Sequence, residues 1–190
     1  MPRAGLTPPR VVDAASVLVD RVGWPHLTMS ALADELGVRQ PSLYKHVDGM
    51  PALQRALAVQ AKRDLARTMA TAAVGRSGAQ AVRSIGHAYR DWARAHPGLY
   101  PAVLRPPTEG DEVDAQASAS AAEVVFEVLA GYGLTGDAAV HLTRALRSGL
   151  HGFVDLEANG GFGIPVSVDS SFEAMLEGFI RALEASGGLE

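Results

Sequence analysis

The sequence predicts an all-α chain, and three observations support that prediction. Alanine, leucine and valine are frequent in a composition that is 47% hydrophobic. Glycine and proline turn signals recur at helix-length intervals, and no run of alternating polar and β-branched residues marks a strand. We therefore expect a three-helix helix-turn-helix domain over residues 1–50. Residues 51–190 are expected to form a helical bundle that dimerises through a four-helix bundle.

The first two helices are marked by residues that begin and end helices. Thr7 precedes Pro8-Pro9, and proline suits a first turn, where its missing N–H costs nothing. Gly23 is the expected end of this helix. The second helix is short: it begins at Thr28, whose hydroxyl can cap it, and ends before Gly37.

The remaining elements follow from apolar periodicity and turn residues. A third short helix is expected to begin at Pro41 and to close at Asp48-Gly49. Ser170 and Glu173 form a predicted capping box for the last helix, which is expected to end at Gly187-Gly188. The other expected elements are long helices at 51–73, 79–95, 115–130 and 137–158, a turn at 99–104, a linker at 106–114 and a glycine-rich loop at 159–165.

Composition limits the classes of protein that the chain can represent. The chain has 190 residues, enough for a sizeable core, and it contains no cysteine. Disulfides, thiolate nucleophiles and cysteine zinc sites are therefore excluded, and a reducing compartment is expected. The start, Met1 to Gly5, lacks an apolar signal core, and no apolar run approaches the roughly 18 residues of a membrane span. We expect a cytoplasmic protein without a membrane partner.

Charge is distributed unevenly along the chain. The formal net charge is −4. Residues 1–65 contain eight Lys/Arg and six Asp/Glu, a net charge of +2, and the remainder contains nine and fifteen, a net charge of −6. The small basic excess therefore lies in the front part of the chain, which includes the predicted helix-turn-helix domain.

Polar and cationic groups crowd the third expected helix and the residues that lead into it. This helix follows the turn at Gly37 and is the second of the two helices that form the predicted helix-turn-helix. The polar and cationic residues are Arg39, Gln40, Ser42, Tyr44, Lys45 and His46. The alternative interpretation is a solvated surface helix, whose polar side chains serve only to keep the protein soluble. A recognition helix requires donors and acceptors for base edges and phosphates. Leu43 and Val47 are expected to anchor this helix to the core.

The residue types allow specific contacts with DNA. Gln40 is suited to an adenine edge, and Arg39 or Lys45 to a guanine or a phosphate. Ser42 and Tyr44 can donate to phosphate oxygens. The expected partner is double-stranded DNA.

The stretch from Leu27 to Val47, LTMSALADELGVRQPSLYKHV, resembles the DNA-binding region of the tetracycline-repressor family. The preceding stretch Val11 to Ala15 matches as well. The resemblance implies a dimeric transcription regulator, by family habit a repressor, that binds a palindromic operator. It places these residues at the DNA: Thr28, Ser30, Arg39, Gln40, Pro41, Ser42, Tyr44, Lys45 and His46. Met50 stands where the family commonly has a phosphate-binding lysine, which predicts a shallower salt dependence of binding.

The second half looks like one recurrent type of effector domain of that family. The similar stretches run from Trp92 to Tyr100 and from Leu150 to Glu157, followed by Gly160 to Gly163 and Ser171-Phe172. The resemblance implies a small-molecule effector. Arg147 stands where this type often has tryptophan, which suggests a differently lined pocket.

Seven side chains from different helices are candidates for an effector pocket. They are Tyr89, Trp92, Tyr100, Leu104, Phe126, Leu146 and His151. Core packing is the alternative for each of them, and His151 also fits a satisfied buried histidine. No histidine spacing suits a metal, so neither a metal nor another cofactor is expected.

The last two helices carry more apolar surface than a small domain can bury. They also contain Gly149, Gly152 and Gly178, each costing up to about 1 kcal/mol in a helix relative to alanine. Close packing against the same helices of a second chain would compensate; an internal core is the alternative. The predicted dimer interface is Leu150, Phe153, Val154, Phe172, Leu176, Phe179, Ile180 and Leu183.

Regulation is expected to act between the two halves. An effector that binds better to a conformation with mis-spaced recognition helices lowers the DNA affinity. The segment His96-Pro97-Gly98 is a candidate hinge. An enzyme, or a protein-binding module using the C-terminal pocket, is the alternative function. Known catalytic motifs are missing from the sequence, so we expect a non-enzyme without catalytic residues.

Overall fold

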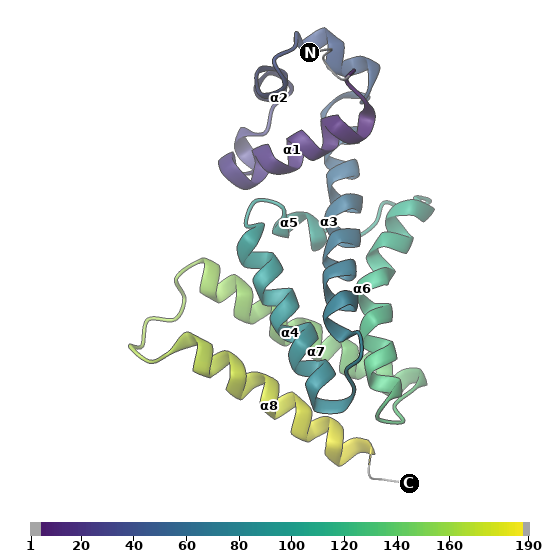
Figure 1. Ribbon diagram of the computed structural model, residues 1–190, viewed down its shortest axis with the longest axis vertical. Helices are drawn as coiled ribbons and strands as arrows, with labels where there is room; N and C mark the ends of the chain where they lie inside the picture. Colours follow the sequence, from purple (N-terminus) through teal and green to yellow (C-terminus); the bar gives the residue numbers. More distant parts are fainter. Residues whose placement is uncertain (1–4, 188–190) are drawn as a thin grey trace. The chain divides into compact units, whose positions relative to one another are not determined.

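The computed structural model describes residues 5–187, and within that range every regular element is a helix. This confirms the predicted all-α class (Figure 1). None of these helices is long and apolar enough to cross a membrane. The elements are α1 Pro8–Val22, the 3₁₀ helix η1 Trp24–His26, α2 Met29–Leu36, the 3₁₀ helix η2 Gln40–Lys45, α3 Gly49–Ala73, α4 Gly78–Ala95, α5 Tyr100–Val103, α6 Glu112–Ala130, α7 Gly136–Ala158 and α8 Val168–Gly187.

The chain forms two compact units. Unit 1 contains the chain up to Arg63 together with His96–Ser118, and unit 2 contains Asp64–Ala95 and the chain from Ala119 onward. Helices α3 and α6 therefore each contribute to both units. The expected boundary at residue 50 lies in the first turn of α3, so the functional division into residues 1–50 and 51–190 stays a prediction.

Local capping explains why the first two helices form where the sequence predicts them. The Thr7 hydroxyl oxygen accepts a hydrogen bond from the Arg10 N–H at 3.4 Å, and the Thr28 hydroxyl oxygen accepts one from the Ala31 N–H at 3.0 Å. Gly37 ends α2 in the left-handed conformation with φ 64°, which glycine adopts without a Cβ penalty. Both predicted helices are confirmed.

Two helices begin earlier than the sequence predicts. Helix α6 begins at Glu112, inside the expected linker, because the Asp111 carboxylate accepts the Asp114 N–H at 3.1 Å. Helix α8 begins at Val168, and the Ser167 hydroxyl accepts the Ser170 N–H at 3.2 Å. The predicted capping box is therefore wrong, because Ser170 already lies inside the helix. The last helix extends through Gly187, and Gly188 lies outside the described residues.

The core of unit 2 is formed where α4 contacts α7 and α8, which also contact each other (Figure 1). Seven of the eight predicted dimer residues are buried in this core: Leu150, Phe153, Val154, Phe172, Leu176, Ile180 and Leu183. Phe179 is half-buried and lies against Gly149, where an added Cβ would be 2.9 Å from its ring. The seven buried side chains pack within one chain and are therefore corrected to an internal core, whereas the place of Phe179 in a dimer interface stays a prediction.

A buried arginine crosses this core. Arg90 of α4 is 4% exposed, and its guanidinium donates to Glu157 of α7 at 2.8 and 2.5 Å. It also pairs with Asp169 of α8 at 2.7 Å and lies 4.8 Å from the ring centroid of Phe172. The pairing satisfies a charge that would be costly to bury alone and ties three helices together.

This arrangement predicts a specific pH dependence of stability. Hydrogen bonds from Arg90, together with its charge, lower the pKa of Glu157 below its ordinary value of 4.5. A carboxylate with a lowered pKa stabilises the folded chain fully above its ordinary pKa, and this stabilisation is lost as pH falls through the lowered pKa. The difference in free energy of unfolding between wild type and Glu157→Gln should be constant above about pH 5.5 and shrink below it. Urea denaturation from pH 7 to pH 3 measures this difference, and a pH-independent difference would contradict the prediction.

Candidate nucleic-acid interface

The segment after α2 is a 3₁₀ turn in place of the expected α-helix. The Ser42 N–H donates to the Arg39 carbonyl at 2.9 Å and the His46 N–H to the Leu43 carbonyl at 2.8 Å, both with i, i+3 spacing. Pro41 has no N–H to donate to an i−4 carbonyl, and short 3₁₀ segments are common as connectors between helices. The expected short helix is therefore present, but it is wound as a 3₁₀ helix, which is tighter than an α-helix.

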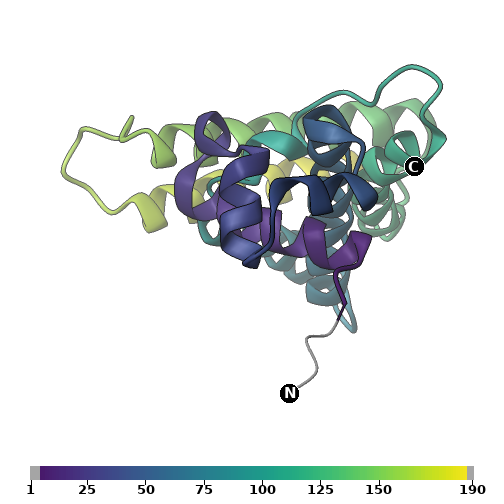
Figure 2. The ribbon, with the colours of Figure 1, turned by 90° about the horizontal axis from the view of Figure 1, so that it is seen from above.

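One side chain fixes this turn to unit 1. Leu43 is fully buried, while Val47 is only half-buried. Helix α2 contacts both α1 and η2, so α1, α2 and η2 form one cluster (Figure 2). The prediction that Leu43 anchors the turn is confirmed; Val47 contributes less than expected.

Most candidate DNA-binding side chains face solvent. The exposed residues are Thr28, Ser30, Arg39, Gln40, Pro41, Tyr44 and Lys45, and the half-buried ones are Ser42 and His46. Tyr44 is 50% exposed although it is aromatic. Within residues 5–187, no hydrogen bond or ion pair engages the side chains of Arg39 and Lys45. Both cations are therefore available to a negatively charged partner.

Two of the candidates contact each other. The Gln40 side-chain amide donates to the Tyr44 hydroxyl at 3.2 Å. This bond spans one turn and fixes the orientation of Gln40, which the sequence pattern did not predict. A glutamine amide has a second N–H and an acceptor oxygen, so Gln40 retains the groups needed to read a base edge.

Thr28, a predicted DNA-binding residue, also caps a helix. Its hydroxyl accepts the Ala31 N–H and so caps α2. Ser30 lies in the first turn of the same helix, where N–H groups lack intrahelical partners. This helix terminus is suited to an anionic group, which is consistent with the predicted phosphate contacts.

Asp20 in the last turn of α1 is a supporting residue that the sequence analysis missed. Its carboxylate accepts the Leu99 N–H at 2.9 Å and lies 2.8 Å from the ring Nδ1 of His96. Asp20 thereby links α1 to the segment before α5 within unit 1. A carboxylate near a helix C-terminus is unfavourable for the helix dipole, and this was the signal that Asp20 has a partner elsewhere.

Arg21, the next residue, forms an ion pair with Glu35 of α2. Because both side chains are partly exposed, this pair contributes little stability. It joins the last turns of α1 and α2, which also pack against each other directly. Asp20 thus contacts the segment before α5, and its neighbour Arg21 contacts α2.

The seven predicted effector-pocket residues fall in both units. Tyr89, Trp92, Phe126, Leu146 and His151 belong to unit 2, and Tyr100 and Leu104 belong to unit 1. Trp92 is buried and its indole N–H donates to the Asp64 carboxylate at 2.9 Å, which gives it a structural role. None of the seven lines the pocket formed by α3, α4 and α6 in unit 2. Their assignment to an effector stays a prediction.

The all-helical fold and the exposed polar turn after α2 define a class of protein: helix-turn-helix transcriptional regulators. Comparison with known proteins agrees. The chain is 40% identical over 158 residues to the uncharacterized HTH-type transcriptional regulator Rv0681 of Mycobacterium tuberculosis, covering 83% of this chain and 72% of that protein. It is 35% identical over 183 residues to the uncharacterized HTH-type transcriptional regulator YobS of Bacillus subtilis, covering 96% and 95%.

The second half and the fold identify the family. Residues 82–179 match the family described as tetracyclin repressor-like, C-terminal domain. The structure of TetR-Q116A from Acinetobacter baumannii in complex with minocycline superposes with a TM-score of 0.71 at 24% identity, covering 97% of this chain and 99% of that one. The chain belongs to the tetracycline-repressor (TetR) family of transcriptional regulators.

Proposed function

We propose that this protein regulates transcription as a homodimer that binds a palindromic DNA operator and is released from it by a small-molecule effector. The turn Gln40–Lys45 of each chain would enter one major groove, with half-sites about one DNA turn apart. Repression is the mode of action that family membership favours. No catalytic role is proposed.

The observation that carries this proposal is the exposure of the side chains on η2. Two cations, a glutamine and a tyrosine project from a turn that a single buried leucine anchors. On a surface without a partner, a half-exposed aromatic side chain gains little from its apolar area. DNA would cover that area and pair with the cations.

Alanine substitutions in η2 and at Arg39 are expected to weaken operator binding. Each of Arg39→Ala and Lys45→Ala should cost about 1–3 kcal/mol of binding free energy. The substitution that removes a phosphate contact should also reduce the slope of log K against log salt by about 1. Gln40→Ala is expected to relax the sequence preference at particular positions. Selection of bound sequences from random duplex DNA, followed by salt titration, measures each effect.

Arg105→Ala is the matched control, because Arg105 is an exposed arginine of unit 1 outside the helix-turn-helix. It should leave operator affinity unchanged. If wild-type protein binds no duplex at low ionic strength, or if Arg105→Ala weakens binding as much as Arg39→Ala, the proposed interface is wrong.

A different face of α7 and α8 fits a second copy. The outward stripe consists of Ala145, Ser148 and Gly152 on α7 and of Ala174, Gly178 and Ala182 on α8. An added Cβ at Gly152 or Gly178 would meet nothing within 4 Å, so packing within the chain does not require these glycines. A closely packed helix of a second copy would explain their cost of about 1 kcal/mol each. The dimer of α7 and α8 from each chain would form the predicted four-helix bundle.

Charge placed on this stripe should weaken the dimer. In Ala174→Arg, each new guanidinium would lose water against a close-packed helix of the second copy, so the dimer dissociation constant should rise about tenfold or more. The matched control is Ala119→Arg, at an exposed position of α6. Sedimentation equilibrium measures both variants, and an unchanged dissociation constant for Ala174→Arg would reject this face.

A further inference from the structure

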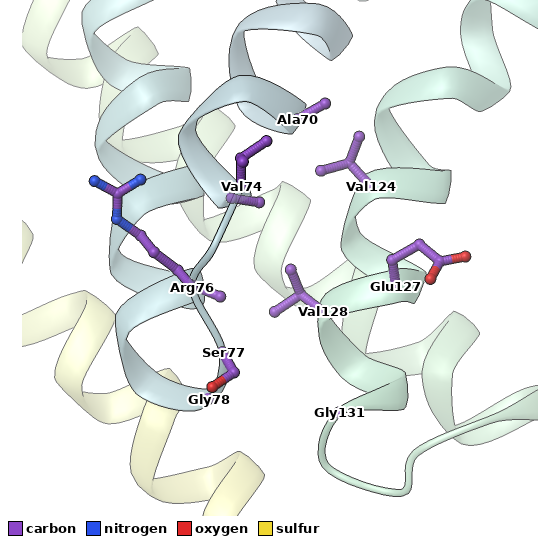
Figure 3. Close-up of a pocket in the computed structure, with 11 residues that line it drawn as sticks. Ala70, Val74, Arg76, Ser77, Gly78, Val124, Glu127, Val128 and Gly131 are labelled. Atoms are coloured by element: carbon purple, nitrogen blue, oxygen red, sulfur yellow. The ribbon is translucent and has the colours of Figure 1, made fainter.

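Unit 2 contains a pocket that does not coincide with the predicted effector residues. It lies between the end of α3, the start of α4 and the end of α6, with a volume of about 320 Å³ (Figure 3). This volume is at the small end of the range for ligand pockets, roughly 300–1,000 Å³. The pocket is formed by residues of unit 2 alone.

The walls of the pocket are mainly alkyl groups, and Ser77 adds a hydroxyl to the lining. Ala70, Val74, Val124 and Val128 surround the same space in Figure 3, and the fully buried Ala81 lies among the lining residues. Val74 is 74% exposed, so little of the protein covers it. An occupant that brought apolar surface against these groups would gain about 25 cal/mol per Å² removed from water.

The charged side chains at the rim are directed away from the pocket. Figure 3 shows the guanidinium of Arg76 and the carboxylate of Glu127 pointing outward. Arg76 is held in this orientation because its Nη1 donates to the Ala72 carbonyl at 2.6 Å. A charged ligand would therefore lose its hydration without gaining an ion pair inside the pocket.

The surroundings favour a small molecule over a protein partner. Exposed polar residues adjoin the lining residues in the chain, among them Thr71, Gln80 and Glu123. A stable protein interface buries about 800 Å² on each side around an apolar centre. The large exposed apolar side chain among the lining residues is Val74, and those exposed chain neighbours are polar, so no apolar centre of that size is available here.

We propose that this pocket binds a compact, uncharged apolar molecule of about two fused rings. An enclosed apolar cavity of roughly 150 Å³ holds one benzene. This pocket is about twice as large and open to solvent at Val74, so a second ring can be accommodated without displacing the walls. The site is separate from the seven residues predicted to bind an effector. Binding here does not depend on the proposed DNA function.

Indole is the probe, and indole-3-carboxylate is its charged counterpart. Titration of the full chain with indole, followed by the methyl NMR signals of Val74, Val124 and Val128, should show saturable shifts at those three residues. The carboxylate should bind about tenfold more weakly or worse, because no cationic group faces into the pocket to compensate for the hydration that the charge would lose against the alkyl walls. DNA is absent from the titration, so the result is independent of operator binding.

Two variants test the location of the site. Ala70→Phe puts a ring into the pocket from an exposed position and should weaken indole binding about tenfold or more. Val124→Thr keeps the shape of the wall and should weaken binding several-fold through its hydroxyl. Ala119→Phe, at an exposed position of α6 outside the pocket, is the matched control and should bind as wild type.

Loss of binding in Ala70→Phe and weakening in Val124→Thr, with Ala119→Phe unchanged, would support the site. Three results would overturn the proposal: no saturation of the valine shifts at the solubility limit of indole, equal binding of the carboxylate, or full binding by both pocket variants.

Discussion

Replacing Asp114 by alanine is expected to destabilise the protein by about 3–5 kcal/mol, because the change leaves the charge of Lys62 buried without a partner. The Lys62 side chain is 3% exposed and its Nζ lies 2.6 Å from Oδ1 of Asp114. Both residues belong to unit 1, where they link α3 to the start of α6. Urea denaturation at neutral pH measures the loss in free energy of unfolding.

Two controls separate the buried charge from other causes. Glu112→Ala removes an exposed carboxylate from the same helical turn and should change stability by less than about 0.5 kcal/mol. The double variant Lys62→Met with Asp114→Leu replaces the ion pair by apolar groups and should recover most of the loss. If Asp114→Ala is as stable as Glu112→Ala, the ion pair does not have the role described.

Replacing Gly98 by alanine is expected to cost about 3 kcal/mol or more, through backbone crowding. A Cβ at Gly98 would lie 2.0 Å from the Val19 carbonyl oxygen and 2.6 Å from the Asp20 Cα. These are backbone atoms of α1, so no side-chain rotation can relieve the overlap. The hydrogen bond from the Leu99 N–H to Asp20 would be broken or strained in the same movement.

The same substitution should also weaken operator binding, since α1 supports α2 and the turn that carries the candidate DNA contacts. Gly163→Ala is the matched control, because an added Cβ there meets nothing within 4 Å. It should change stability by less than about 0.5 kcal/mol. Equal stability of Gly98→Ala and Gly163→Ala would show that the segment before α5 does not press on α1 as the structure indicates.

The close contact at Gly98 bears on the predicted hinge. Proline and glycine interrupt the helical pattern at His96-Pro97-Gly98, which predicts a hinge there. In the structure the His96 ring and the Gly98 backbone of this segment contact α1, and so does the N–H of the next residue, Leu99. Gly98 does not have a positive φ, so its close approach to α1 is what requires glycine. The role of the segment in regulation stays a prediction.

Sequence reasoning succeeded where the determining groups lie within a few residues of each other. The caps at Thr7 and Thr28 and the stop at Gly37 are local hydrogen bonds and dihedral preferences, and the structure confirms them. It failed at α8, where Ser167 and Ser170 are both possible caps. Only the packing of the helix against its neighbours selects between them.

Burial was predicted less well than helix position. The apolar side chains of α7 and α8 were assigned to a second copy, whereas Phe172 and Leu176 are fully buried against the chain's own helices. An amphipathic pattern indicates that one face of a helix is buried. It does not indicate whether that face packs against the same chain or against a second copy. For the same reason Arg90 had no visible role until its partners on two other helices were known.

Neighbouring residues are enough to specify the helical class, the ends of the first helices and a polar turn of the kind that contacts DNA. Packing between distant segments specifies which helix faces are internal, where buried charges find partners and where a pocket remains. Those outcomes depend on contacts between residues far apart in the chain, and no local pattern records them.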